Sequence, residues 1–422
     1  MRDDEKLCLK GREMAELKTI DNAWMLVDDG RIKAFGSMDS MPSIEGETVD
    51  AEGGYVFPSF CDSHTHIVYA GSREGEFVDK IRGLSYAEIA RRGGGILNSA
   101  DRLHDLSEDE LYEQAMRRVR EIVGKGTGAV EIKSGYGLNT ADELKMLRVI
   151  RRIKQTAPLK VVATFLGAHA VGREYAGRQD EYVDLVVNEM LPEVAREGLA
   201  DFVDVFCDEG FFTPEETARI LQTGLKYGLR GKIHGQELAD SGGVEVAVEN
   251  AALSVDHLES MTERDIELLK KAPLSSPEGD TNVQNKGNEA PSRAVGGALI
   301  PTALPGTSFF LNMPFAPGRK IIDAGLPLAV ASDYNPGSTP SGDMKFVVSL
   351  ACIKMRLLPA EAINAATVNS AAAMDLSREY GSLRRGNVAN FFITEPLSSV
   401  DFLPYAYTTP VIRRVFLRGE EQ

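Results

Sequence analysis

Residues 55–66 read YVFPSFCDSHTH, an apolar run that ends in two histidines. Seven later runs share the character of the first, which covers 55–61. Each is short, apolar and rich in β-branched residues, and each is followed by a polar or glycine-rich break and a stretch of helical periodicity. They lie at 128–133, 160–166, 202–207, 230–233, 253–256, 298–303 and 327–332. Because the runs are continuously apolar instead of alternating, they predict parallel strands buried on both faces.

The regular alternation of strand and helix predicts the fold class. Eight strand–helix repeats indicate an α/β fold in which the strands close into a (β/α)8 barrel of the TIM type. An open, doubly wound sheet is the alternative, since a count of strands does not prove closure. Three capping-box patterns mark helix starts, with a hydroxyl and a carboxylate three residues later each accepting a backbone N–H. They are Ser107 with Glu110, Thr140 with Glu143, and Thr213 with Glu216.

The two ends of the chain have a different pattern. Residues 23–35 resemble a hairpin, and 386–393 and 411–417 are further strand-like pieces near the C-terminus. We therefore expect a small β-sandwich domain formed from both termini, with residues 1–54 and 379–422 flanking a barrel domain of residues 55–378. Segment 272–296 is polar and rich in Pro, Gly and Asn, which predicts an exposed, mobile insertion between the sixth and seventh strands.

Charge and composition limit the classes of partner. The chain has 47 basic and 63 acidic residues and a net charge of −16, which argues against nucleic acid and anionic membranes as partners. The N-terminus lacks the apolar core of a signal peptide, and no apolar run is long enough for a transmembrane helix. The cysteines, Cys8, Cys61, Cys207 and Cys352, are far apart and form no C-x-x-C motif. These features predict a reduced, cytoplasmic protein.

Five of the six histidines directly follow predicted strands. They are His64 and His66 after the first strand, His169 after the third, His234 after the fifth and His257 after the sixth, while Asp333 follows the eighth. Any one of them is better explained as a hydrogen-bonded packing residue, and His104 is expected on the surface at a helix start. Together they meet at the carboxyl ends of the strands, where barrel active sites form. Because residues two apart on a strand point to the same side, both imidazoles of the H-x-H pair can face one metal ion.

This arrangement resembles the amidohydrolase superfamily. By that resemblance one divalent metal, Zn²⁺ or Fe²⁺, would be held by His64, His66, His234 and Asp333. Binuclear members carry a bridging modified lysine after strand four, whereas this chain has Phe206-Cys207-Asp208-Glu209 there, so a single metal is expected. We expect Lys133, after strand two, to form a salt bridge, and Asp208 and Glu209 to be supporting or solvated residues.

Further motifs resemble the imidazolonepropionases, a family of ring-opening enzymes within this superfamily. They are Asp62–His66 with Arg73, 91–96 (RRGGGI), 133–138 (KSGYGL), 166–170 (LGAHA), 256–259 (DHLE) and 333–338 (DYNPGS). The resemblance implies a small substrate that carries a carboxylate, contacted by Arg73, Tyr136, His169, Glu237, Asn335, Gly337 and Ser338. His257 would lie beside the metal-bound water, and a homodimer would follow the habit of the family.

The family's reaction hydrolyses 4-imidazolone-5-propanoate, a cyclic amide formed in histidine degradation, to N-formimidoyl-L-glutamate. The metal would lower the pKa of its water to about 7, so that hydroxide attacks the ring amide at neutral pH. Asp333 or His257 would accept the proton, and Glu237, the carboxylate of the H-x-x-E motif, would deliver one to the leaving ring nitrogen. Arg73 suits the propionate because its planar fork can grip a carboxylate at two points.

Two other functions stay open from the sequence. A mononuclear-metal deaminase of a purine or pyrimidine ring would use the same metal ligands and Glu237, and a metal-binding scaffold would have lost catalysis. The set of Arg73, Tyr136 and His169 favours the carboxylate-bearing substrate. Two features depart from the family: another β-strand commonly precedes the segment that begins at Leu7, and Asn390 stands where Asp is common. Both concern the sandwich, so we expect them to affect packing and not catalysis.

Overall fold

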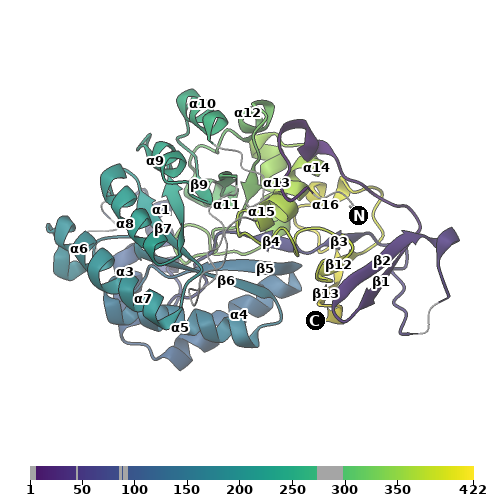
Figure 1. Cartoon of the computed structure of the whole chain (residues 1–422), viewed down its shortest axis with the longest axis horizontal. Helices are drawn as coiled ribbons and strands as arrows, with labels where there is room; N and C mark the ends of the chain where they lie inside the picture. The colour runs from purple at the N-terminus through teal and green to yellow at the C-terminus, as the bar shows by residue number, and fades with distance from the viewer. Residues whose placement is uncertain (1–5, 44–45, 85–87, 89–93, 273–297) are drawn as a thin grey trace, which may run out of the picture.

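The computed structural model describes residues 6–43, 46–84, 88, 94–272 and 298–422. Eight parallel strands form one sheet in which every strand pairs with its neighbours in chain order, surrounded by helices (Figure 1). The strands are β4 (Phe60–Asp62), β5 (Thr127–Lys133), β6 (Lys160–Ala168), β7 (Phe202–Cys207), β8 (Arg230–Gly235), β9 (Ser254–His257), β10 (Ile300–Ala303) and β11 (Ala329–Val330). This order confirms the predicted barrel-type α/β fold.

The first and last strands of the barrel meet through contacts just beyond their carboxyl ends. Thr65 forms a parallel bridge with Tyr334. The N–H of Asp333 donates to the carbonyl of His64 at 3.0 Å, and the N–H of His66 donates to the carbonyl of Tyr334 at 3.0 Å. These bonds close the sheet on itself, which an open doubly wound sheet does not do, and they place the segment after β11 beside the H-x-H pair.

Helices follow the barrel strands as the periodicity predicts. Those of the first half are α1 (Glu74–Ile81), α3 (Ile96–His104), α4 (Glu108–Gly124), α5 (Thr140–Thr156), α6 (Gln179–Leu185), η4 (Val186–Met190), α7 (Leu191–Glu197) and α8 (Pro214–Lys226). Those of the second half are α9 (Gly243–Glu249), α10 (Glu263–Lys271), α11 (Pro305–Leu311), α12 (Gly318–Asp323), α13 (Met344–Met355), α14 (Pro359–Asn364), η5 (Ala365–Asn369), α15 (Ser370–Ala372) and α16 (Phe402–Tyr405). Short turns of helix, η1 (Gly11–Ala15), η2 (Met38–Ser40) and η3 (Arg173–Tyr175), complete the set.

Two of the three predicted capping boxes are confirmed, those that start α4 and α8. The third, Thr140 with Glu143, is wrong. Asn139 caps α5 instead, and its side chain accepts the N–H of Asp142 at 2.9 Å. Glu143 turns toward the preceding loop, where it accepts the N–H of Gly137 at 2.7 Å. The glycine-rich loop offers more N–H groups than a helix start does, and this competition decides where the carboxylate binds.

The first apolar run forms two strands and not one. β3 (Val56–Pro58) joins an antiparallel sheet with β12 (Phe391–Thr394), β13 (Ile412–Leu417) and β14 (Glu420–Glu421), while β4 belongs to the barrel. At the junction the N–H of Ser59 donates to Asn390 and the next N–H, of Phe60, donates to Gly126. Pro58 has no N–H to continue a ladder, so the chain changes partners at this point.

The strands near the two ends form a second, smaller unit beside the barrel, next to both chain ends (Figure 1). A hairpin of β1 (Ala23–Asp28) and β2 (Arg31–Ser37) is separate from the four-stranded sheet, and Ile32, Phe35, Phe391, Ile393 and Phe416 pack together between them. This is the predicted β-sandwich. The domain limits given above stay a prediction, and the predicted insertion at 272–296 lies outside the described residues except for Ala272.

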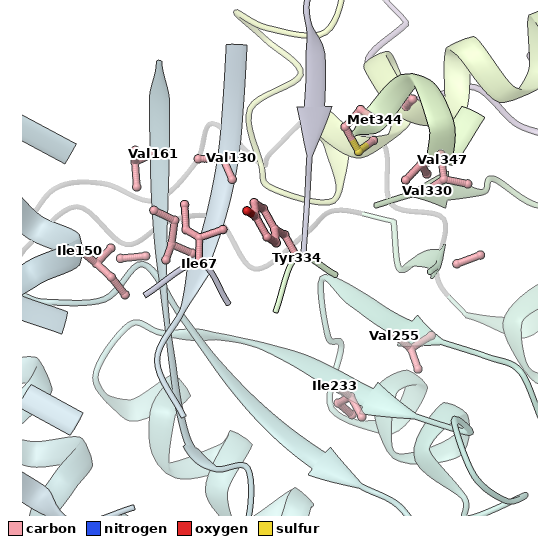
Figure 2. Close-up of a cluster of buried hydrophobic side chains, with 14 of the residues drawn as sticks. Ile67, Val130, Ile150, Val161, Ile233, Val255, Val330, Tyr334, Met344 and Val347 are labelled. Carbon is pink, nitrogen blue, oxygen red and sulfur yellow. The ribbon is translucent and has the colours of Figure 1, made fainter. Parts of the chain in front are cut away.

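The core between the barrel strands and their helices is continuous and apolar. Figure 2 shows part of it, with Met344 and Val347 of α13 beside Val330 of β11. These side chains are buried, so the barrel is a packed body that holds the carboxyl ends of its strands in fixed positions. Among the described residues, no helix has the length and apolarity needed to cross a membrane.

Candidate functional site

Residues from the carboxyl ends of the barrel strands line one cavity of about 580 Å³. Eleven predicted site residues contribute to its wall: His66, Arg73, Tyr136, His169, His234, Glu237, His257, Asp333, Asn335, Gly337 and Ser338. The remaining one, His64, is fully buried against His66 in the floor of the site. The tertiary structure therefore brings all the sequence-predicted residues together.

Four side chains in the floor direct their polar atoms at one point. The Nε2 atoms of His64 and His66 are 3.3 Å apart, and those of His66 and His234 are 3.4 Å apart. Oδ1 of Asp333 lies 3.6 Å from Nε2 of His64 and 3.5 Å from Nε2 of His66. Metal–nitrogen bonds of about 2.0–2.1 Å place the donors of a tetrahedral site about 3.3–3.4 Å apart. The four atoms thus have the spacing of ligands around one divalent ion.

The outer nitrogens of two of these imidazoles face carboxylates. Nδ1 of His64 lies 2.7 Å from Asp256 and Nδ1 of His234 lies 3.0 Å from Asp204. A proton held on Nδ1 leaves the lone pair of Nε2 pointing at the centre of the site. Burial and neighbouring positive groups also hold the pKa of His64 well below its usual value, so its imidazole is neutral. Neutral imidazoles that face one another at this distance repel unless a cation lies between them, which fits a divalent metal.

A network of fully buried charges supports these carboxylates from below. Nζ of Lys133 lies 2.7 Å from Asp204, 2.8 Å from Glu131 and 3.7 Å from Asp256. Lys232 binds Glu131 from the other side. Although burial opposes its charge, the surrounding carboxylates raise the pKa of Lys133. The prediction that Lys133 forms a salt bridge is confirmed. Sequence reasoning missed Asp204 and Asp256, whose signal was an acidic residue inside an apolar strand.

Replacing Lys133 with methionine is expected to lower the free energy of unfolding of the metal-free protein by about 3–5 kcal/mol, because it leaves Asp204 and Asp256 buried without their shared cation. Urea denaturation followed by circular dichroism measures the change. Lys270→Met is the matched control, since the exposed Lys270–Glu267 pair should contribute less than about 0.5 kcal/mol. Equal stability of the two variants would contradict the assigned weight of the buried network.

Asp333 is fixed by the loop that follows it. Its Oδ2 accepts hydrogen bonds from Thr307 at 2.6 Å and from Ser338 at 3.2 Å, which leaves Oδ1 facing the histidines. Asn335 holds the loop in turn, because its side-chain oxygen accepts the N–H groups of Gly337 and Ser338, both at 2.8 Å. Asp333 itself has a φ of 54°, a left-handed conformation that costs free energy in a non-glycine residue. The loop therefore keeps a strained carboxylate in position.

Glu237 and His257 form a pair beside the candidate metal ligands. Oε2 of Glu237 lies 3.7 Å from Nε2 of His257, whose Nδ1 lies 3.6 Å from Glu259. Burial raises the pKa of Glu237 to about 7, close to the value for a proton donor at neutral pH. Burial opposes the charge of His257, but the two carboxylates raise its pKa to about 10. With His64 and His234, His257 forms a second group of potential ligands.

Asp208 has a supporting role in this corner. Its carboxylate accepts the backbone N–H groups of Glu237 at 2.8 Å, Leu238 at 2.9 Å and Ala239 at 3.2 Å. It therefore fixes the loop after β8 and the backbone of Glu237, as the expectation of a supporting residue holds. His104, by contrast, ends α3 and does not start a helix, and its exposed side chain contacts Asp142 at 2.8 Å. A helix end exposes a side chain as readily as a start, so its surface position is as predicted.

Tyr136 and His169 form one wall of the cavity. Nδ1 of His169 lies 3.0 Å from the carbonyl of Gly135, and burial, with a contribution from His234, lowers the pKa of His169 to about 3. The imidazole is therefore neutral. The rings of Tyr136 and His169 are 5.4 Å apart, and the loop between them is held by Glu143. A neutral imidazole and a phenol are suited to hydrogen bonds with a polar ring.

The opposite end of the cavity is formed by α1 and the loop after β11. Nε of Arg73 lies 3.1 Å from Glu76, and its guanidinium packs on Gly337, where an added Cβ would lie 1.9 Å from Nη2. Lys80, Phe77 and the segment around Phe310 line the same end, and the sequence analysis did not single them out. The available signal was the seven-residue spacing of Arg73 and Lys80 on one helix face. Residues 91–93 of the glycine-rich motif lie outside the described residues.

Comparison with known proteins gives three findings. The model of the amidohydrolase family matches residues 55–420. The chain is 52% identical over 421 residues to the imidazolonepropionase of Christiangramia forsetii, which covers 100% of this chain and 96% of that protein. It is 41% identical over 387 residues to the imidazolonepropionase of Geobacillus kaustophilus, which covers 90% of this chain and 85% of that protein.

Solved structures with the same fold are more distant in sequence. Guanine deaminase of E. coli has a TM-score of 0.71 at 14% identity and covers 98% of this chain and 95% of its own. A 5-methylcytosine deaminase from Klebsiella pneumoniae, liganded with phosphonocytosine, has a TM-score of 0.70 at 16% identity and covers 94% of this chain and 93% of its own. At such identities the likeness concerns the fold alone.

Proposed function

We propose, from the premise that the chain belongs to the amidohydrolase family and there to the imidazolonepropionases, that it hydrolyses 4-imidazolone-5-propanoate to N-formimidoyl-L-glutamate. One observation supports this above the others: a single cavity joins the cluster of three histidines and Asp333 to Arg73 at its other end. A ring amide that carries a propionate needs a metal centre for its carbonyl and a cation for its carboxylate, and the cavity offers both.

We assign the metal ligands to His64, His66, His234 and Asp333, with Zn²⁺ or Fe²⁺ as the ion, since both accept imidazole and carboxylate donors. A bound divalent ion would lower the pKa of a water to about 7 and so supply the nucleophile at neutral pH. The three imidazoles and the single carboxylate leave room for one ion. The four cysteines are unpaired, which favours a cytoplasmic location.

The other residues orient the ring and move protons. Arg73 binds the propionate, and Tyr136, His169, Asn335, Gly337 and Ser338 contact the ring and its substituent. Water must lose a proton before it attacks the ring carbonyl. Because the carboxylates of Glu237 and Glu259 keep His257 protonated, we favour Asp333 as the acceptor. Glu237 then donates a proton to the ring nitrogen as its bond to the carbonyl carbon breaks, which releases the open-chain product.

The direct test is product analysis after the metal-replete protein is incubated with freshly made imidazolonepropionate, beside a sample without enzyme that measures spontaneous decay. We expect accelerated formation of N-formimidoyl-L-glutamate. Release of ammonia from a panel of heterocyclic amines, without any ring-opened product, would instead establish the deaminase alternative. Neither product, with metal bound, would leave a binding scaffold.

Replacing Arg73 with alanine is expected to raise KM by about 10²-fold and to change kcat by less than about threefold, because a buried charge-assisted contact to the propionate is lost before and during the reaction. Steady-state kinetics and metal analysis measure the two effects separately. Arg152→Ala is the control, since Arg152 is an exposed cation on α5. An unchanged KM in the Arg73 variant would remove Arg73 from the carboxylate site.

A further inference from the structure

Lys80 is a second cation at the Arg73 end of the cavity. It lies seven residues after Arg73 on α1, and both side chains line the cavity. Nζ of Lys80 donates to the carbonyl of Gly337 at 3.0 Å, the same residue against which the guanidinium of Arg73 packs. The two positive groups therefore approach one point of the wall from the same helix.

The charges at this end do not balance. Glu76 pairs with Nε of Arg73 and also accepts the backbone N–H of Gly95 at 3.0 Å, so it offsets one positive charge. Of the described residues that line the cavity, the carboxylates are Glu237 and Asp333, which belong to the candidate metal end. Burial, followed by the charge of Arg73, lowers the pKa of Lys80, as expected where a cation lacks a full partner. One negative charge in the ligand would restore the balance.

We infer that Lys80 binds the carboxylate of the substrate together with Arg73 and so makes the site specific for a ring that carries an anionic side chain. The inference rests on the proposed function and deepens it. Arg73 supplies a planar fork and Lys80 a mobile point charge, so the two hold different oxygens of one carboxylate. The apolar side chains of Phe77 and Phe310 border this end and exclude water, which strengthens both contacts.

The test is calorimetric binding of 3-(imidazol-4-yl)propanoate, which contains no amide to hydrolyse, and of its neutral primary amide to the metal-loaded protein. Lys80→Met is expected to weaken binding of the acid by about tenfold and to leave binding of the amide within about twofold. Lys80→Arg should retain most of the affinity for the acid. Lys226→Met, an exposed lysine that ends α8, is the matched control and should bind both ligands like the wild type.

Three outcomes would overturn the inference: an equal loss for acid and amide, which would mean that Lys80 acts only by holding Gly337; no loss for either; and no binding of the acid to the wild type. Turnover of imidazolonepropionate by the wild type is measured in parallel. Selective loss of acid binding in Lys80→Met without any wild-type turnover would support the carboxylate site and refute the proposed reaction. Normal turnover with unchanged binding would do the reverse.

Discussion

Replacing His234 with alanine is expected to lower the affinity for the divalent metal and the value of kcat/KM by about 10³-fold or more each. The variant removes one of four converging donor atoms and leaves the buried carboxylate of Asp204 without the imidazole 3.0 Å away. Three donors remain, which do not complete a closed site. Metal content after dialysis, affinity by competition with a chelator, and formation of N-formimidoyl-L-glutamate measure the result.

His104→Ala is the matched control for this experiment. His104 is the one histidine outside the cavity, and its side chain is 71% exposed. The control should keep metal and activity within about twofold, because exposed residues away from a site change little. Full metal content and activity in the His234 variant would show that the converging nitrogens are a packing arrangement and not a metal centre.

Replacing Glu237 with glutamine is expected to lower kcat by about 10²–10⁴-fold while metal content stays at the wild-type level. Glutamine keeps the shape of the side chain, and the backbone N–H of residue 237 still donates to Asp208. What is lost is a carboxyl group whose pKa burial raises to about 7, the group that we assign to protonation of the leaving nitrogen. Single-turnover measurements of ring opening report this step directly.

A second variant separates proton transfer from orientation. Glu237→Ala opens space in the cavity, and added formate should restore part of its kcat, since a small carboxylic acid can occupy that space. Glu237→Gln leaves no space and should not respond to formate. Lack of rescue in the alanine variant, together with a large rise in KM in both, would assign Glu237 to substrate binding instead of proton transfer.

The local sequence was enough to predict the barrel and most of the cavity wall. Continuous apolar runs separated by helical periodicity can be buried only between layers of helices, so they indicated parallel strands without any distant information. The position of each histidine after a run then followed from the topology, because parallel strands in a barrel end at the same face. The resemblance of the motifs to a known family added the substrate and the roles.

Other features depended on partners that are distant in the chain. The break of the first run at Ser59 arises because Asn390 and Gly126 offer different pairing partners on either side of Pro58. Glu143 left its expected capping position for the N–H groups of a glycine-rich loop.

The same holds for the charges around the candidate metal centre. Asp204 and Asp256 each face an imidazole, and Lys133 is shared between them, although these residues come from different strands. Periodicity carries no information about which buried charges meet, and burial makes such pairing obligatory without specifying the partner. The sequence by itself therefore determined the scaffold and the set of reactive residues, and only the tertiary structure decided how their charges and protons are held.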